Sequence, residues 1–348
     1  LDLGFLDFST LERRRFCCNE ELRLNSRLAA PIYLDVVPIT GSAEQAVING
    51  TGNVIEYAVR MVQFPQQAQL DNMLANGELE NHHIDAIAER VAEFHQATDV
   101  AAKDSAFGDP EKVYYPVEEN FTQIRQHLHT HAYDEQLAAL ERWSQSTFES
   151  LKPFFSRRKA DGFIRECHGD MHLRNLVWFD GEPLAFDCLE FNPALRWIDT
   201  LSEVAFFFMD LQYRQQPEFA HRFLNRYLER CGDYQGMQVF RFSLVYRALV
   251  RAKVDAIRCG QPHITEAEKQ GAEQEFLAYL DQADGYTRPG SQTLLITHGL
   301  SGSGKSRGTG ELLMQMPLVR IRSDVERKRL AGIFQKGDSG SAPGEGIY

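Results

Sequence analysis

Positive charge is scarce in this 348-residue sequence, which has 37 lysines and arginines against 49 aspartates and glutamates, a net charge of −12. A nucleic-acid surface needs a basic excess to replace counterions, so we expect no nucleic-acid partner. The six cysteines lack paired metal-ligand spacing. The sequence also shows neither a long apolar run nor a signal peptide, and we therefore expect reduced thiols, a cytoplasmic location and no membrane contact.

The length and composition are those of an ordinary globular protein. With 348 residues, 43% hydrophobic and 25% charged, the chain can form about two domains with sizeable cores. It begins at Leu1 inside an apparent strand and stops at Tyr348 without a terminating element. We therefore expect a fragment of a longer protein.

Three oxygen-bearing side chains are predicted to converge within Ile164–Glu190. Apolar residues before His168 and in two following runs indicate short strands. Asp170 and Asn175 then lie on the loop after the first strand, and Asp187 lies at the end of a hairpin. Phosphoryl transfer needs an Asp to receive the acceptor proton, and Asn and Asp oxygens to hold magnesium.

The pattern His-Gly-Asp-x-His-x-x-Asn, followed by an apolar residue and Asp, resembles the catalytic loop of the aminoglycoside phosphotransferase and choline kinase group. This resemblance implies an α+β protein-kinase-like domain with two lobes that uses ATP and Mg²⁺. It makes Asp170 the catalytic base and Asn175 and Asp187 the metal ligands. It also implies a small-molecule acceptor, whose identity the sequence does not give.

Two other interpretations of this stretch remain open. His168 and His172 are four residues apart and could bind zinc, although Gly169 and the neighbouring strands argue against the helix that such a pair requires. Alternatively, Asp170 and Asn175 could simply form turns. We expect His168 to orient the loop through hydrogen bonds.

The resemblance divides residues 1–285 into a small lobe, 1–64, and a large lobe, 65–285. A helix is predicted from Leu11 to about Ala30, and Glu21 on it matches the small-lobe Glu that pairs with a nucleotide-contacting Lys. Glu21 could equally be a solvated carboxylate on the helix surface. Strands are predicted at Leu34–Ile39, Ala46–Ile48 and Val54–Val62, with a hairpin across residues 49–52 joining the last two.

The large lobe is predicted to be mostly helical. Asp199 should cap a buried helix, and His95 should be a structural residue. Tyr246, Arg247, Arg251 and Lys253 share one helix and could face an anionic or polar substrate, or could form a solvated face. The predicted helices begin near Asn81, Phe121 and Tyr133 or span residues 200–211, 218–230, 239–257 and 266–283.

A second nucleotide motif follows a linker at residues 284–291. A predicted strand at 293–297 leads into Gly299-Leu-Ser-Gly302-Ser-Gly304-Lys305-Ser306, the full Walker A pattern Gly-x-x-x-x-Gly-Lys-Ser. Its backbone amides should surround phosphates, Lys305 should reach the terminal phosphates, and Ser306 should bind magnesium. After a second strand at 318–321, Asp324 resembles the substrate-side base of small P-loop kinases, a role compatible with a helix N-cap.

The two motifs in this order resemble a bacterial two-domain family in which a phosphotransferase-like domain is fused to a P-loop kinase-like ATPase domain. Two departures limit the resemblance. The small-lobe Lys would precede Leu1, and residues 291–348 are too few for more than the start of an α/β P-loop domain.

These patterns favour an ATP-dependent phosphotransferase acting on a small-molecule hydroxyl, with a second P-loop site. A nucleotide-sensing or scaffold protein is the alternative, but it would not need the base Asp170. A metal hydrolase using His168, His172 and Asp187 is a third possibility that tightly bound zinc would reveal.

Overall fold

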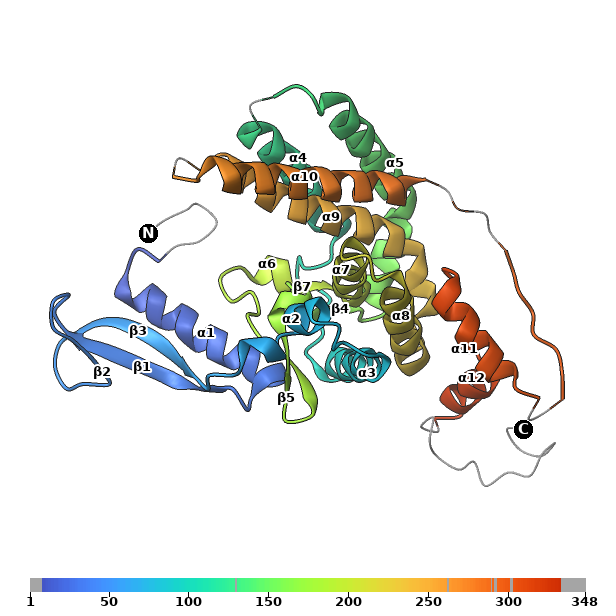
Figure 1. Cartoon of the computed structure of the whole chain (residues 1–348), viewed down its shortest axis with the longest axis horizontal. Coiled ribbons are helices and arrows are strands. Elements are labelled where there is room, and N and C mark those ends of the chain that lie inside the picture. Colours follow the sequence, from blue (N-terminus) through green and yellow to red (C-terminus); the bar gives the residue numbers. More distant parts are fainter. Residues whose placement is uncertain are drawn as a thin grey trace. The chain divides into compact units, whose positions relative to one another are not determined.

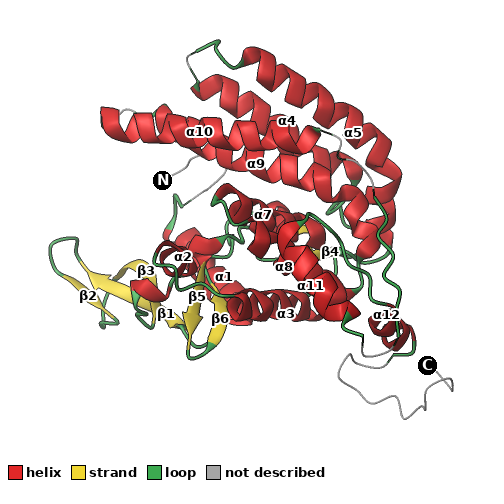
Figure 2. Ribbon diagram, turned by 45° about the vertical axis from the view of Figure 1, so that its right-hand side comes forward, coloured by secondary structure: helices red, strands yellow, loops and turns green. Residues whose placement is uncertain are grey.

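The computed structural model describes residues 8–128, 130–261, 263–288, 290, 293–300 and 303–332. The described chain forms two compact units, each built from separate segments. Figure 1 follows the chain by colour, and Figure 2 distinguishes its strands from its helices. The first unit contains residues up to 79, 97–116 and 152–207, and the second contains 80–96, 117–151 and the described residues from 208 onward.

The first unit begins with helix α1, Leu11–Ala29, as predicted. The side chain of Thr10 caps it by accepting a hydrogen bond from the Arg13 amide at 3.3 Å. Leu24 and Leu28 are buried on one face of α1. This amphipathic face packs on strands β1 and β3 of the adjoining sheet.

The sheet of the first unit has the order β2-β1-β3, with all neighbours antiparallel. Its strands are β1, Tyr33–Gly41, β2, Ala46–Ile48, and β3, Val54–Met61. The predicted β2–β3 hairpin is wrong, because both strands pair with opposite edges of β1. Because β2 and β3 both run antiparallel to β1, the connection between them crosses β1 instead of turning back along β2. At its start, Asn49 has a positive φ of 56° and its amide donates to the Pro38 carbonyl at 2.7 Å.

Four further strands of the first unit surround the predicted catalytic stretch. β5 and β6 form an antiparallel hairpin, in which Val177 pairs with Leu184, and β4 pairs with β7. The hairpin turns at Asp180 and Gly181, which both have positive φ, the geometry that an Asp-Gly turn favours. The bounds are Ile164–Glu166 for β4, Leu176–Phe179 for β5, Glu182–Ala185 for β6 and Trp197–Asp199 for β7.

A small core joins these elements. Ile32 and Tyr33, at the start of β1, pack with Val177 and Leu184 of the hairpin. The three strands predicted within Ile164–Glu190 are confirmed. The remaining short elements of this unit are α2, Leu70–Ala75, α6, Pro193–Arg196, and the 3-10 helices Gln66–Ala68 and Leu173–Asn175.

Helix α7, Thr200–Tyr213, is buried on nearly every side, as its apolar sequence predicts. Asp199 accepts a hydrogen bond from the Leu201 amide at 2.8 Å, which confirms its capping role. Its carboxylate also pairs with buried Arg158, whose Nη2 lies 2.8 Å from Oδ1. Asp199 therefore fixes the start of α7 and ties it to helix α5.

The second unit is helical, and α9 and α10 run side by side along their length (Figures 1 and 2). The predicted late helices are confirmed. α4 begins at Pro110, a residue that suits the first position of a helix, and not near Phe121, because the helix continues through the interior Pro116. The long helices, some of which also contribute residues to the first unit, are α3, Asn81–Ala97, α4, Pro110–His127, α5, Asp134–Ala160, α8, Pro217–Cys231, α9, Met237–Cys259, and α10, Glu266–Thr287.

Helices α3 and α8 are joined by a ladder of three ion pairs. The pairs are Asp85–Arg222, Glu89–Arg226 and Glu93–Arg230. Each pair has the same sequence separation of 137 residues. The two helices therefore run parallel, with one pair per turn.

The P-loop segment forms helices α11, Lys305–Gln315, and α12, Ser323–Leu330. The strands predicted at 293–297 and 318–321 are not formed in the described chain. Leu294 and Ile296 are 83% and 82% exposed, and neither segment makes a strand ladder with described residues. A strand requires a hydrogen-bonded neighbour, which periodicity alone does not supply. Among the described helices, none has the length and apolarity to span a membrane.

Candidate active site

The loop after β4 turns at Gly169. This residue has a φ of +91°, and a Cβ there would lie 2.9 Å from the Leu195 carbonyl oxygen. Its amide donates a 2.6 Å hydrogen bond to the Oε1 of Glu203, which is buried on α7. Glycine is therefore required sterically, and Glu203 holds the turn in place. Sequence reasoning missed Glu203, although it is one of only two acids, with Asp210, in the largely apolar helix α7.

Asp170 and Asn175 face each other across this loop. The Nδ2 of Asn175 donates to the backbone oxygen of Asp170 at 3.0 Å and to its Oδ2 at 3.1 Å. The Nε2 of His172 lies 3.3 Å from the same Oδ2. Because the amide nitrogen of Asn175 faces Asp170, its amide oxygen points away from that carboxylate and suits a cation.

Asp187 follows β6 at the end of the hairpin, as predicted. Its φ is +64°, an unusual value for a residue with a side chain and one that is concentrated at functional sites. Its amide donates to the Tyr33 hydroxyl oxygen at 3.3 Å. Burial, and then the negative charge of Asp170, raise the pKa of Asp187. The structure thus brings the two carboxylates close together.

This donor set fits Mg²⁺. The ion prefers oxygen ligands, and Asn175 and Asp187 supply an amide and a carboxylate oxygen. A bound cation would relieve the repulsion between Asp170 and Asp187 that raises the pKa of the latter. The zinc interpretation is less compatible, because the Nε2 of His168 is bonded to a backbone carbonyl and that of His172 faces Asp170.

His168 links the loop that carries Asp170 to the end of the hairpin that carries Asp187. It is buried, and its Nε2 donates to the Phe186 carbonyl oxygen at 2.8 Å, next to Asp187. Burial lowers the pKa of His168, so the ring is neutral at neutral pH. The Phe186 amide also bonds to the Asn175 carbonyl at 3.0 Å. These contacts agree with the orienting role expected for His168.

Glu21 on α1 lies in the same acidic region. Burial, followed by the charges of Glu190 and Asp187, raises the pKa of Glu21 to about 7. A cationic group beside Glu21 would offset these effects and favour its charged form. Its role in nucleotide binding stays a prediction.

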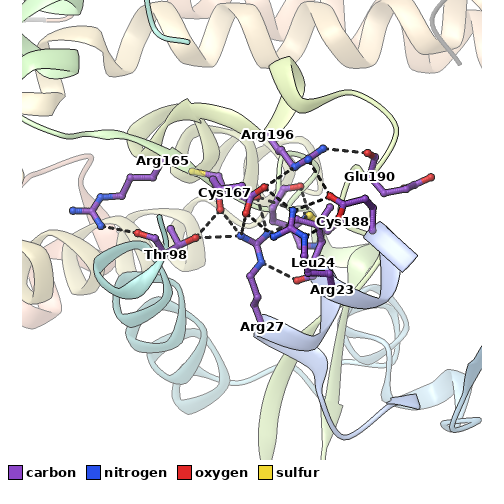
Figure 3. A network of polar contacts seen from close by, with 12 residues as sticks. Arg23, Leu24, Arg27, Thr98, Arg165, Cys167, Cys188, Glu190 and Arg196 are labelled. Atoms are coloured by element: carbon purple, nitrogen blue, oxygen red, sulfur yellow. Dashed lines mark hydrogen bonds and ion pairs between the residues drawn. The ribbon is translucent and has the colours of Figure 1, made fainter. Parts of the chain in front are cut away.

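A buried polar network ties α1 to the site (Figure 3). Its centre is Glu166, which is 4% exposed. The carboxylate binds Arg23 at 2.9 Å, Arg27 at 3.1 Å and Arg196 at 3.1 Å. Glu20 also pairs with Arg23 at 2.8 Å. We call these five residues the Glu166 network.

The arginines of the network reach the backbone on both sides of the site. Arg27 donates to the carbonyl oxygens of Glu166 at 2.8 Å and Cys167 at 3.3 Å, just before His168. Arg196 donates to the carbonyls of Leu189 at 3.2 Å and Glu190 at 3.1 Å, just after Asp187 (Figure 3).

Asn25 adds a third link, because its Oδ1 accepts from the Cys188 amide at 2.9 Å. α1 is thereby bound to the chain before His168 and to the residue after Asp187. No local spacing in the sequence signals these contacts, which join residues more than 130 positions apart.

The P-loop has the backbone conformation that its glycines allow. Gly299 and Gly304 have φ of +152° and +81°, and Lys305 begins α11. The Nζ of Lys305 donates to the carbonyls of Gly299 at 2.7 Å and Leu300 at 2.6 Å. Ser306 is the second residue of α11. Gly302 lies outside the described residues.

Asp324 lies in the first turn of α12 and is not its N-cap, a position that Arg322 occupies. Burial raises the pKa of Asp324, but the Arg322 guanidinium, 2.8 Å from its Oδ2, holds that pKa below the ordinary value. The residues that the sequence predicts as site residues therefore form two groups. Glu21, Asp170, Asn175 and Asp187 belong to the first unit, whereas Gly299, Gly304, Lys305, Ser306 and Asp324 belong to the second.

Comparison with known families gives two matches. Residues 46–240 match the phosphotransferase enzyme family, and residues 294–345 match an AAA domain. With the antiparallel strands and the helices of the fold, these matches confirm the predicted α+β protein-kinase-like fold followed by a P-loop segment.

Curated relatives are longer than this chain. Uncharacterized proteins of Mycobacterium tuberculosis and Mycobacterium bovis are 30% identical to it over 329 residues, which cover 94% of this chain and 63% of each relative. Two kinases are among the similar solved structures. Choline kinase from Cryptosporidium parvum has 13% identity and a TM-score of 0.46, covering 67% of this chain and 72% of its own. The amicoumacin kinase hAmiN, in complex with AMP-PNP and Ca²⁺, has 13% identity and a TM-score of 0.45, covering 78% and 79%.

Proposed function

Because the chain belongs to the phosphotransferase enzyme family, we propose that its first site transfers the terminal phosphoryl group of ATP to a hydroxyl of a small molecule. The observation that carries this proposal is the pairing of Asp170 with Asn175, next to Asp187. A base and two metal ligands are the protein groups that such a reaction requires. We propose that the protein acts in the cytoplasm.

Asp170 is the proposed base, which accepts the proton of the acceptor hydroxyl as the new phosphate ester bond forms and the bond between the terminal phosphorus and the bridging oxygen of ATP breaks, with ADP as the leaving group. Asn175 and His172 both contact its Oδ2, and they therefore restrain the carboxylate. Asn175 and Asp187 would hold Mg²⁺, which would neutralise negative charge on the phosphates. Neutral His168, through its hydrogen bond to the Phe186 carbonyl, would keep the Asp170 loop and Asp187 at a fixed separation.

The Glu166 network would hold the backbone of the site in the arrangement that this chemistry requires. It fixes the backbone next to His168 and Asp187, and it fixes α1, which carries Glu21. Preorganised groups lose less free energy when the reactants bind, because the protein does not reorganise during the reaction.

We propose that the P-loop is a second nucleotide site. The family match, Gly299, Gly304 and the placement of Lys305 and Ser306 at the start of α11 support this proposal. Lys305 would contact phosphate, and Ser306 would bind the accompanying Mg²⁺. Gly302, in the same motif, would contribute to the loop, and Asp324 would face an acceptor.

The test of the first site compares Asp170→Asn with Asp180→Asn, which makes the same chemical change at an exposed hairpin turn. We expect Asp170→Asn to lower transfer by about 10²–10⁴-fold, while Mg²⁺-nucleotide affinity changes by only a few-fold. Asp180→Asn should leave both unchanged. The measurements are phosphate transfer across an acceptor panel, and calorimetry in a Lys305→Ala background that silences the P-loop.

Two results would contradict the proposal. If Asp170→Asn transfers phosphate at a rate within a few-fold of that of the unmodified chain, Asp170 is not the catalytic base. Tight nucleotide binding at the first site without transfer to any acceptor would favour the nucleotide-sensing alternative.

A further inference from the structure

Helix α8 has a second polar face besides the ladder to α3. Asn225 and Glu229 are one turn apart on α8, and both side chains are buried, with exposures of 3% and 2%. Gly232 caps the helix in the left-handed conformation, with φ of +80°. We call Asn225, Glu229 and Gly232 the α8 docking face. Charged groups such as Glu229 are rarely buried without a specific partner.

Asn225 binds the backbone of the chain that follows α11. Its Nδ2 donates to the Leu318 carbonyl at 2.8 Å, and its Oδ1 accepts from the Arg320 amide at 2.7 Å. A single side-chain amide thus satisfies two backbone groups of an extended segment, as a neighbouring strand would do. This contact explains where hydrogen-bonding groups of the predicted strand at 318–321 are satisfied.

Two arginines of the same segment contact α8 at Glu229 and Gly232. The Nη2 and Nε of Arg320 lie 2.7 Å and 3.0 Å from Glu229 Oε1. Arg329 donates to the Glu229 carbonyl at 2.5 Å, and its Cζ lies 2.7 Å from where a Cβ of Gly232 would be. A side chain at position 232 would therefore displace Arg329.

Arg320 also contacts the P-loop helix. Its Nη1 donates to the Ser306 carbonyl at 3.3 Å. One guanidinium group therefore binds both a buried carboxylate of α8 and a residue of the nucleotide motif. The planar fork of arginine allows such simultaneous contacts, which lysine does not reproduce.

We infer that the α8 docking face binds residues 318–329 specifically, and that Arg320 couples this docking to phosphate binding at the P-loop. Rearrangement of the Walker A loop around a phosphate would alter the Ser306 contact and, through Arg320, the environment of Glu229. The occupant of the face is a segment of this chain. The docking claim is independent of the proposed catalysis, whereas the coupling claim rests on the proposed P-loop nucleotide site.

Docking can be tested by hydrogen exchange measured by mass spectrometry on the full chain. In Arg320→Ala, we expect amide exchange of residues 317–332 and of the C-terminal half of α8 to rise about tenfold or more. Arg322→Ala is the matched control, because Arg322 is two residues away and pairs with Asp324 of its own segment. Equal exchange in the two variants would overturn docking.

A conservative variant separates the loss of the Arg320 contacts from a general loss of folding in Arg320→Ala. Arg320→Lys keeps the charge that neutralises Glu229 but loses the fork. It should keep the circular dichroism spectrum of the unmodified chain and still raise exchange several-fold in the same two regions. Exchange unchanged in Arg320→Lys, with the fold intact, would contradict the specific role of Arg320.

Coupling is tested by adding MgATP. Exchange in α8 should change at least twofold in the unmodified chain, and it should not respond in Arg320→Ala or Lys305→Ala. Absence of a nucleotide-dependent change in α8 overturns coupling. Calorimetric comparison with Lys305→Ala then shows whether the P-loop failed to bind or bound without coupling, and the docking result stands separately.

Discussion

Replacing the hub of the Glu166 network should destabilise the first unit strongly. Glu166→Ala removes a buried carboxylate from three guanidinium groups, and Arg196, with its side chain only 5% exposed, keeps a weaker contact to Glu20 at 3.5 Å. Removing one partner of a buried ion pair costs about 3–5 kcal/mol, because the other charge stays desolvated. The Arg23 side chain is 46% exposed, so its pair adds only about 0–1 kcal/mol.

The matched variants set the scale of this effect. Glu166→Gln keeps the shape and one acceptor oxygen, but its NH2 group cannot accept from the guanidinium donors that face the second carboxylate oxygen. We expect it to cost less than Glu166→Ala, about 1–3 kcal/mol. Asp35→Asn weakens an ion pair of the same unit whose side chains are 45% and 56% exposed. That pair should contribute at most about 1 kcal/mol.

The assay is urea unfolding followed by tryptophan fluorescence. Trp178 and Trp197 report on the first unit, and a Trp143→Phe background removes the signal of the second unit. We expect the midpoint to fall in the order unmodified or Asp35→Asn, then Glu166→Gln, then Glu166→Ala. If Glu166→Ala unfolds at the same urea concentration as Asp35→Asn, the network does not stabilise the unit as described.

Acidification gives an independent measure of the same contribution. Burial raises the pKa of Glu166, but the facing arginines outweigh it and hold that pKa below its ordinary value. A carboxyl group with a lowered folded-state pKa contributes stability above its ordinary pKa of about 4.3 and loses it as the pH falls through the folded-state value. The stability difference between Glu166→Gln and the unmodified chain should therefore persist from pH 7 to 5 and shrink below about pH 4.

Two further substitutions probe the first site directly. Gly169→Ala places a Cβ 2.9 Å from the Leu195 oxygen at a φ of +91°, so we expect a loss of about 1–3 kcal/mol in unfolding free energy and roughly 10²-fold in transfer, and normal values for both would refute the steric argument. Asp187→Asn keeps the size but removes the charge, so Mg²⁺ titrations at fixed nucleotide should show at least about tenfold weaker metal dependence. Unchanged Mg²⁺ dependence would mean that Asp187 is not a ligand.

Local patterns predicted the elements that carry the site. The apolar runs gave the strands before His168 and in the hairpin, and their spacing predicted that Asp170 and Asn175 would lie near Asp187. The strands and the three site residues all lie within a few dozen residues of one another in the sequence. Over such a short range, the hydrophobic period and the turn residues are sufficient to predict the local structure.

Long-range contacts were not predictable in this way. Arg27 and Glu166 are 139 residues apart, and either one alone resembles a solvated surface charge. The hairpin across Asn49–Gly52 was mispredicted because the turn residues fit, whereas strand choice depended on both edges of β1. The segment 318–321 has a strand sequence, but its backbone is bound by the Asn225 side chain.

The parallel ladder between α3 and α8 has a consequence for synthesis on the ribosome. Asp85 leaves the ribosome 137 residues before its partner Arg222. At about 5–20 residues per second, this delay is roughly 7–27 s. The first unit likewise needs residues up to 207. Neither unit can be completed while the N-terminal half is being made, so we expect nascent chains to expose apolar surface and to depend on chaperones until α8 and the helices that follow it emerge.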